Sequence, residues 1–200
     1  MTKERILKVA QEIFSKKGFD STTTQEIAER AKVNKAMIHY YFKNKEGLYI
    51  EILRKLFSEI ASKILNIFSM NLTPPEKFKL LISEYIDFIS KNRFLPPLVL
   101  RSVLSYKRNI YEIIKEIMLP VYKKGEEVFD EGKRKGYFYD YDYKNLIPTL
   151  IGAIIFYFIA HPVFSFIWED NPLSNENLEK RKNELIKFIE KALIKSTEEK

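Results

Sequence analysis

The chain contains no cysteine and few glycines. Without a thiol among its 200 residues it forms no disulfide, no thiolate zinc site and no cysteine nucleophile, which suits an intracellular protein. Its 6 glycines fall below the usual share of about 7% and leave few positions for tight turns of positive φ. Two isolated histidines, His39 and His161, do not make a metal site. We therefore predict an all-α fold that holds no metal and no cofactor.

Enzyme signatures are also lacking. The sequence has no glycine-rich phosphate loop and no pairing of a nucleophile with a base, so we predict that the protein is not an enzyme. A signal peptide is missing as well, because charged residues interrupt the apolar positions of residues 1–19. This pattern predicts a cytoplasmic protein.

Positive charge is concentrated at the start of the chain. Residues 1–45 contain ten Lys or Arg against five Asp or Glu, a net charge of +5, whereas the other 155 residues contain 24 against 22, a net charge of +2. A concentrated positive charge suits a polyanion, because neutralised phosphates release their counterions. A solvated basic face is the commoner explanation of a lysine-rich helix, so charge alone does not establish nucleic-acid binding.

Three short helices are predicted within the basic segment. Residues 4–17 have apolar residues at helical spacing and end before Gly18. Thr23 and Glu26 form a capping box that begins a helix ending near Ala31, and a third helix covers residues 35–42. Such short helices make no large core of their own, so they are better explained as a DNA-reading unit.

Longer helices follow. Residues 46–69 form one amphipathic helix, and Thr73 begins another; the prolines at 96 and 97 break the chain, and Pro120 bends a later helix. The remaining predicted helices cover residues 98–106, 109–135 and 174–195. Residues 137–143 alternate aromatic and polar side chains, but a single strand has no partner here, so we predict a loop.

One uncharged segment, residues 146–168, is long enough to cross a bilayer. Pro148 and Pro162 would confine the uninterrupted helix to residues 149–161, and His161 lies inside the segment. We therefore interpret it as a core or dimer-interface helix and predict no membrane partner.

Residues 5–52 contain a series of motifs in order: Ile6-Leu7, Ala10-Gln11-Glu12-Ile13-Phe14, Lys17-Gly18-Phe19, Thr22-Thr23-Thr24-Gln25-Glu26-Ile27-Ala28, Ala31-Lys32-Val33-Asn34-Lys35 and Tyr40-Tyr41-Phe42-Lys43-Asn44-Lys45-Glu46-Gly47-Leu48. Through these motifs the segment resembles the DNA-binding domain of the tetracycline-repressor (TetR) family. It covers a quarter of the chain, and the rest resembles the family in helical layout and length. The resemblance implies a three-helix bundle with a helix-turn-helix, residues 1–46, joined by a long helix to a ligand-binding and dimerisation domain, residues 47–200.

In a helix-turn-helix the second helix enters the major groove by its first residues. The candidate DNA-binding residues are Thr24, Gln25, Asn34, Lys35, Ala36, Met37, His39, Tyr40, Tyr41 and Lys45. Lys35 could donate to guanine or to a phosphate, and small Ala36, where the family usually has glycine, allows close approach to the bases. The tyrosine hydroxyls suit phosphate oxygens, and we expect Tyr40 to face DNA.

Three of these candidates carry open alternatives. Thr24 and Lys45 look like the phosphate-binding threonine and lysine of the family, and Thr24 is also a possible helix cap. His39 departs from the family's usual tyrosine, which leaves the contact at that position open.

The resemblance also implies a small-molecule cavity in the later helices. Phe and Tyr total 27 residues and most follow residue 50, so they fill either the core or a pocket wall. The candidates for the wall are Tyr85, Phe88, Tyr106, Tyr122, Phe129 and Phe156. No cluster of charges marks this region, which predicts a small apolar or aromatic effector.

These patterns together predict a sequence-specific transcriptional regulator. We expect a ligand-released repressor that binds duplex DNA at a palindromic operator as a homodimer through residues 145–160 and 174–195. The alternative is a helical interaction or scaffold protein without DNA binding, which would explain the apolar helices but not the concentrated basic segment.

Overall fold

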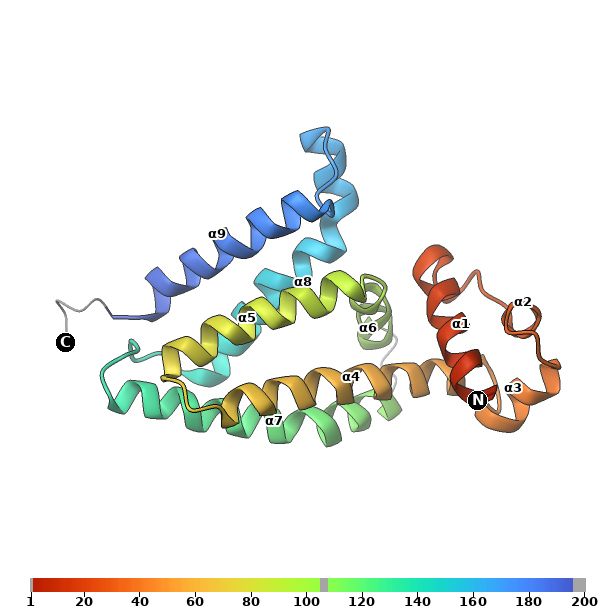
Figure 1. Ribbon diagram of the computed structural model, residues 1–200, viewed down its shortest axis with the longest axis horizontal. Helices are drawn as coiled ribbons and strands as arrows, with labels where there is room; N and C mark the ends of the chain where they lie inside the picture. The colour runs from red at the N-terminus through yellow and green to blue at the C-terminus, as the bar shows by residue number, and fades with distance from the viewer. Residues whose placement is uncertain (1, 105–107, 196–200) are drawn as a thin grey trace. The chain divides into compact units, whose positions relative to one another are not determined.

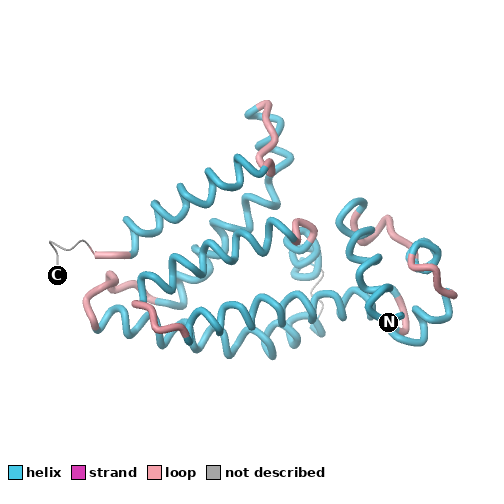
Figure 2. Tube along the Cα trace, in the orientation of Figure 1, coloured by secondary structure: helices cyan, strands magenta, loops and turns pink. Residues whose placement is uncertain are grey.

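The computed structural model describes residues 2–104 and 108–195, and this part of the chain is helical (Figures 1 and 2). The helices are α1 Thr2–Lys17, α2 Thr24–Arg30, α3 Lys35–Phe42, α4 Lys45–Ser69, α5 Pro74–Lys91, α6 Leu95–Leu104, α7 Arg108–Arg134, α8 Tyr143–Trp168 and α9 Asn175–Leu193. The predicted all-α fold is confirmed, and the predicted third helix has the observed bounds.

Residues 137–142 form a loop, as predicted. A single antiparallel bridge joins Phe138 to Ile194, and the Tyr139 amide donates to the Leu193 carbonyl at 3.1 Å. No strand forms within the described ranges, because the alternating segment pairs with only these few residues after α9.

Proline positions were predicted wrongly in two helices. Pro96 and Pro97 do not break the chain; they lie in the first turn of α6, where an amide has no helical partner to lose. Pro148 and Pro162 lie inside α8, which continues through both. Pro162 leaves the Phe158 carbonyl without its helical donor, and the ring Nδ1 of His161 lies 2.9 Å from that oxygen. A local side chain therefore compensates for the missing bond.

The chain packs as two compact units. The first contains residues 1–59 and 92–117, and the second contains residues 60–91 and 118–200. Two of the three boundaries fall within helices, α4 and α7, and the third follows the last residue of α5. The predicted domain boundary between residues 46 and 47 divides the chain by expected function and does not coincide with these packing units. It stays a prediction.

The first unit has a core built from the apolar faces of α1 to α4. Tyr49 of α4 is fully buried, and its hydroxyl donates to the Leu98 carbonyl of α6 at 2.8 Å and contacts Ser102. Arg101 of α6 forms a bidentate ion pair with Asp20, which lies in the loop between α1 and α2. These contacts explain why α6, distant in sequence, belongs to the same unit as the first three helices.

In the second unit α5 packs against both α8 and α9. Its core contains an aromatic cluster of Phe78, Phe129 and Phe138, in which the last two rings are stacked with centroids 5.1 Å apart. Gly132 of α7 makes room for it, because a Cβ there would lie 2.3 Å from the Phe138 ring. The cluster packs the C-terminal end of α7 against α5.

Candidate DNA-reading helix and effector cavity

The turn between α2 and α3 is held by its own capping side chains. The Thr23 hydroxyl accepts from the Glu26 amide at 3.1 Å, which confirms one half of the predicted capping box; the reciprocal bond from the Thr23 amide to the Glu26 carboxylate does not form. The Glu26 carboxylate pairs with Lys17 and with Arg30. Asn34 caps α3 by accepting from the Ala36 amide at 2.8 Å. The caps at Thr23 and Asn34 thus define where α2 and α3 begin and, with them, the length of the turn between the two helices.

The capping role changes the interpretation of two candidates. Thr23 rather than Thr24 is the cap of α2, and Thr24 is its partly buried first residue. Asn34 uses its side-chain oxygen for α3, so this atom is engaged within the protein. Gln25 is exposed, and its side chain bonds to Glu29 on the same helix at 2.8 Å.

Helix α3 presents a largely exposed surface. Lys35, Ala36 and His39 are exposed, Met37 is partly buried, and Ile38 and Phe42 form the buried face. Tyr40 is 77% exposed, and its ring meets Tyr41 edge to face with centroids 5.1 Å apart. A helix with a buried aromatic face and a free face of Lys, His and Tyr is suited to enter a groove.

Gly47 determines how closely α3 approaches α4. A Cβ on Gly47 would lie 1.9 Å from the backbone oxygen of Phe42, the last residue of α3. The Asn44 side chain accepts from the Gly47 amide at 2.8 Å, and Lys43 takes a positive φ of 67° at the turn. The close backbone contact therefore depends on the absence of a side chain.

Lys45 makes contacts within the protein. Its ammonium donates to the carbonyls of Phe19 at 2.9 Å and Thr22 at 2.8 Å, and lies 3.4 Å from the Asp20 carbonyl. The same nitrogen lies over the Phe19 ring, 4.4 Å from its centroid. An ammonium has three N–H groups, and all three face the loop between α1 and α2. The structure thus gives Lys45 a positioning contact, and its predicted contact with phosphate stays a prediction.

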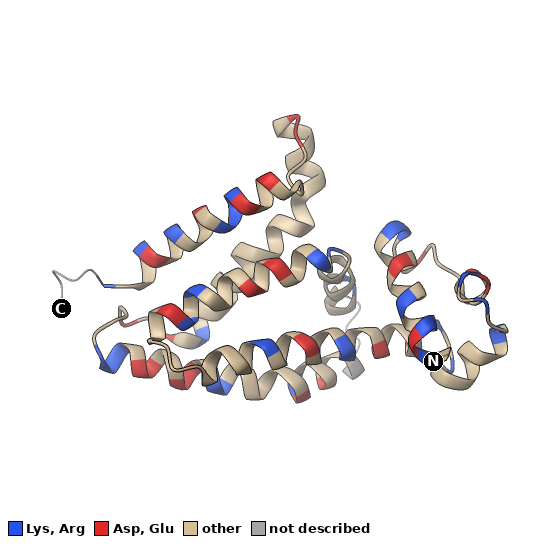
Figure 3. Cartoon of the chain, viewed as in Figure 1, with Lys and Arg blue, Asp and Glu red and all other residues tan. Residues whose placement is uncertain are grey.

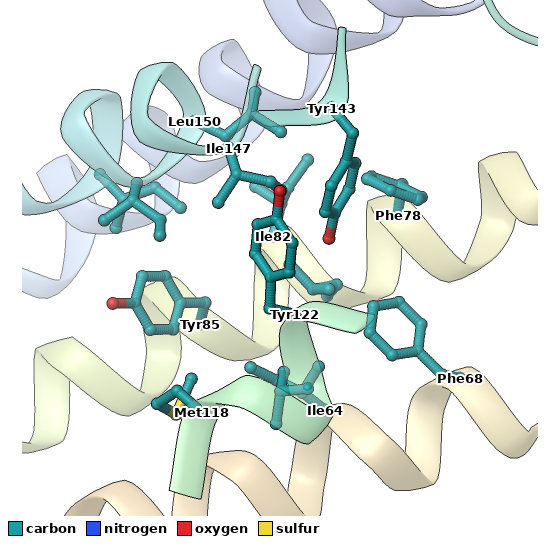
Figure 4. Close-up of a pocket in the computed structure, with 14 residues that line it drawn as sticks. Ile64, Phe68, Phe78, Ile82, Tyr85, Met118, Tyr122, Tyr143, Ile147 and Leu150 are labelled. Carbon is teal, nitrogen blue, oxygen red and sulfur yellow. The ribbon is translucent and has the colours of Figure 1, made fainter. Parts of the chain in front are cut away.

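The second unit contains an apolar cavity of about 180 Å³ between α4, α5, α7 and α8 (Figure 4). It is lined by Ile64, Phe68, Phe78, Leu81, Ile82, Tyr85, Met118, Val121, Tyr122, Tyr143, Ile147, Leu150, Ile151 and Ile154. None of these described residues carries a charge. The cavity is therefore a site for an uncharged, mainly apolar molecule.

Two of the predicted wall residues, Tyr85 and Tyr122, line this cavity. Phe88 and Phe129 do not: both are buried in the core beside it. Phe156 is 62% exposed and lines an open groove between α8 and α9. Tyr106 lies outside the described residues. Helical spacing in the sequence identifies aromatic residues that are buried. Only the packing of the helices decides which of these residues line a cavity and which contact other core side chains.

Sequence reasoning missed Tyr143, which is buried against the cavity. It was assigned to the alternating loop, whereas it is the first residue of α8. Asp142 caps that helix by accepting from the Lys144 amide at 3.2 Å. An aspartate directly before an apolar run is a helix-start signal, and it could have placed Tyr143 on the helix.

Two family profiles match the chain. The one described as bacterial regulatory proteins, tetR family, matches residues 6–52, and the one described as tetracyclin repressor-like, C-terminal domain, matches residues 74–189. The second match covers more than half of the chain. The chain belongs to the tetR family.

Relatives of this tetR-family chain agree with the assignment. It is 33% identical over 137 residues to the probable HTH-type transcriptional regulator YttP of Bacillus subtilis (strain 168), an alignment that covers 67% of this chain and 66% of YttP. The chain thus spans about two thirds of the length of this curated relative. Its functional class is that of a helix-turn-helix transcriptional regulator.

Solved structures show the same fold. HlyIIR, a hemolysin II transcriptional regulator, has 26% identity and a TM-score of 0.62, covering 92% of this chain and 97% of its own. FadR from Bacillus subtilis, in complex with stearoyl-CoA, has a TM-score of 0.73, covering 93% of this chain and 96% of its own. At 18% identity FadR shows the fold alone.

Helix α8 of this tetR-family chain is long and apolar enough to cross a membrane by length and composition, yet only 17% of its most apolar window is buried. Figure 3 shows that it carries almost no charge, whereas α5, α7 and α9 carry many. Phe166 on α8 is 86% exposed and Phe188 on α9 is 67% exposed. These two helices therefore present a large apolar surface that the described residues leave uncovered.

Proposed function

We propose that this tetR-family protein is a cytoplasmic repressor that binds a palindromic operator as a homodimer and is released by a small effector. The observation that supports the proposal is the exposed face of α3, which offers Lys35, Ala36 and Tyr40 together. The buried face of the same helix is fixed by Phe42 and by the approach to Gly47. A rigid helix with a free polar face is what major-groove readout requires.

Roles on α3 follow from position and chemistry. Lys35 and Ala36 lie in its first turn, the part of a recognition helix that meets base edges. Lys35 donates to guanine O6 and N7, and Ala36 lets the helix approach closely. Tyr40 and Tyr41 donate to phosphate oxygens, and His39 and Met37 border the contact. Thr24 and Gln25 at the start of α2 lie where the first helix crosses the DNA backbone.

The apolar cavity is the proposed effector site. The related fold of FadR was solved with stearoyl-CoA, so this architecture can enclose a small molecule. The cavity is lined by residues of α4, α5, α7 and α8, and two of these helices, α4 and α7, begin in the first unit. An occupant can shift DNA affinity only by binding two conformations unequally. We infer that the empty form binds the operator and that the occupied form does not. The division into a reading part, residues 1–46, and a sensing part, residues 47–200, is part of this proposal.

The proposed dimer buries the exposed apolar surface of α8 and α9. A second copy is favoured over a bilayer because α9 contributes to the same surface and carries charges along its other faces. Two copies place two α3 helices on half-sites about 34 to 36 Å apart, or further on an underwound operator. An enzymatic role has no support from the sequence or from the family.

The test is selection of bound duplexes from a random pool with the full chain, followed by binding measurements on the recovered site. We expect a palindromic sequence, because the dimer is symmetric. Lys35→Ala should cost about 1–3 kcal/mol of binding free energy and relax discrimination at particular base pairs. No enriched sequence, with the protein folded and dimeric, would contradict the proposal and favour a helical scaffold protein.

A further inference from the structure

Three tyrosines line the apolar cavity from three different helices. Tyr85 comes from α5, Tyr122 from α7 and Tyr143 from the start of α8 (Figure 4). The Tyr122 and Tyr143 rings pack edge to face with centroids 5.1 Å apart. In Figure 4 these two rings run in opposite directions, so their oxygens lie at opposite ends of the pair. The three hydroxyl oxygens thus lie at different points around the cavity rather than together on one wall.

These hydroxyls have no hydrogen-bond partner within the described part of the chain. Of the three, Tyr143 is buried and Tyr85 and Tyr122 are half-buried. The buried Tyr49 and Tyr157 differ: Tyr49 donates to the Leu98 carbonyl, and Tyr157 donates to the Pro172 carbonyl at 2.8 Å. A buried hydroxyl without a partner costs free energy, so this protein normally supplies one. The exceptions cluster around one cavity, which indicates that their partners come from a bound molecule.

The ionisation state of the phenols is fixed by burial. Desolvation raises the pKa of Tyr85 to about 12 and also raises the pKa of Tyr122 and of Tyr143. All three are therefore neutral at physiological pH and can both donate and accept a hydrogen bond. A neutral lining offers no compensation to a charged ligand, which would have to leave water for an apolar space.

The size of the cavity limits the occupant. A dry cavity of roughly 150 Å³ lined by Leu, Ile and Phe is enough for benzene, and this one measures about 180 Å³. It suits one substituted ring rather than a long acyl chain or a nucleotide-bearing thioester. Gly125 sets part of this shape, because a Cβ there would lie 2.1 Å from the Tyr143 hydroxyl.

We propose that the effector is an uncharged molecule of about one substituted ring, such as an alkylated phenol, which exchanges hydrogen bonds with Tyr85, Tyr122 and Tyr143. The proposal rests on the effector role assigned above to this cavity. Aliphatic side chains hold the body of the molecule by burial, and the hydroxyls select an oxygen-bearing ligand over a hydrocarbon of the same shape.

The experiment is calorimetric titration of the full chain with four matched probes. They are 4-ethylphenol, its isostere 4-ethyltoluene, the anion 4-ethylbenzoate and the cation phenyltrimethylammonium. We expect 4-ethylphenol to bind about three- to tenfold tighter than 4-ethyltoluene, the range of one or two hydrogen bonds, and both charged probes to bind weakest. Equal binding of the phenol and the hydrocarbon, tighter binding of either charged probe, or no binding of any probe would overturn the proposal.

Tyrosine variants test which hydroxyls cause the preference for 4-ethylphenol over 4-ethyltoluene. Tyr122→Phe and Tyr143→Phe should reduce the phenol preference about two- to tenfold and leave 4-ethyltoluene binding unchanged. Tyr141→Phe is the matched control, because Tyr141 is exposed in the loop before α8 and does not line the cavity. An equal loss for the phenol and the hydrocarbon would show a shape effect and contradict the hydroxyl role.

Release of labelled operator is measured separately. If the phenol binds preferentially and the operator stays bound, the cavity chemistry stands and the regulatory proposal fails. If 4-ethyltoluene releases the operator as well as the phenol does, the regulatory proposal stands and the chemistry assigned to the hydroxyls fails.

Discussion

At the scale of single residues, similar side chains have different roles in the first unit. Lys35 and Lys45 are both cations of the helix-turn-helix region, but Lys35 is exposed, whereas the Lys45 ammonium faces the carbonyls of Phe19, Asp20 and Thr22. A lysine held in this way organises a loop, because one ammonium donates to several of its carbonyls, of which that of Phe19 also accepts from the Thr22 amide. We therefore assign base reading to Lys35 and positioning to Lys45.

Lys45→Met tests the positioning role. The substitution keeps the apolar stem over Phe19 and removes the donors, so operator affinity should fall evenly across sequences while the slope of log affinity against log salt stays unchanged. A lysine that contacts phosphate would instead lower that slope by about 0.9 when replaced. Titrations at several salt concentrations distinguish the two.

Lys8→Met provides the control. Lys8 is exposed on α1, so this variant removes the same charge without disturbing the loop carbonyls. A slope that changes in Lys45→Met but not in Lys8→Met would assign Lys45 to a phosphate.

At the scale of elements, one glycine controls the junction between α3 and α4. Gly47 lies in the first turn of α4, and the Phe42 carbonyl occupies the space that a side chain would fill. The Phe42 carbonyl is a backbone group and cannot rotate out of the way as the end of a flexible side chain can. The contact with Gly47 therefore sets the placement of α3 relative to α4. Helix propensity alone would favour alanine here by about 1 kcal/mol.

We expect Gly47→Ala to reduce operator affinity at least tenfold while the chain remains folded. The methyl group would push the end of α3 away from α4 and so misplace its exposed face. Fluorescence anisotropy with the selected operator measures the loss, and circular dichroism verifies folding.

Ser58→Ala is the matched control for that variant, because Ser58 is exposed on the same helix and gains the same residue. Operator binding by Gly47→Ala as strong as that of this control would show that the junction adjusts at no cost to DNA binding.

At the scale of the whole molecule, the exposed surface of α8 and α9 governs assembly. Phe156, Phe166 and Phe188 are exposed in the single chain, and burying them against a second copy would be favourable. In the proposed symmetric dimer, one α3 helix per chain would address each half of the proposed palindrome.

Phe188→Glu should weaken the dimer at least tenfold, because a carboxylate placed in an apolar interface loses its hydration. Sedimentation equilibrium measures the change, and operator affinity should fall with it. Leu104→Glu is the control: Leu104 is 69% exposed and lies on α6, which contributes no residue to the proposed interface of α8 and α9. A wild-type chain that sediments as a monomer at micromolar concentration would contradict the homodimer.

Local patterns in the sequence predicted most helices. The bounds of α3 and the cap at Thr23 depend on neighbouring residues, and periodicity over a few turns is sufficient to find them. The course of α8 through Pro148 and Pro162 was not predictable in this way, because propensity treats each proline as a break.

The sequence by itself determined the helical class, the family and the set of residues on α3, since these depend on composition, periodicity and a motif within 48 consecutive residues, 5–52. Only the tertiary structure decided that α6 packs with the first helices, that Lys45 faces a loop, and that Tyr85 and Tyr122 meet a cavity while Phe88 and Phe129 meet the core. The physical reason is that helical periodicity fixes which side of a helix is apolar, whereas contact with empty space or a distant carbonyl depends on how remote segments pack.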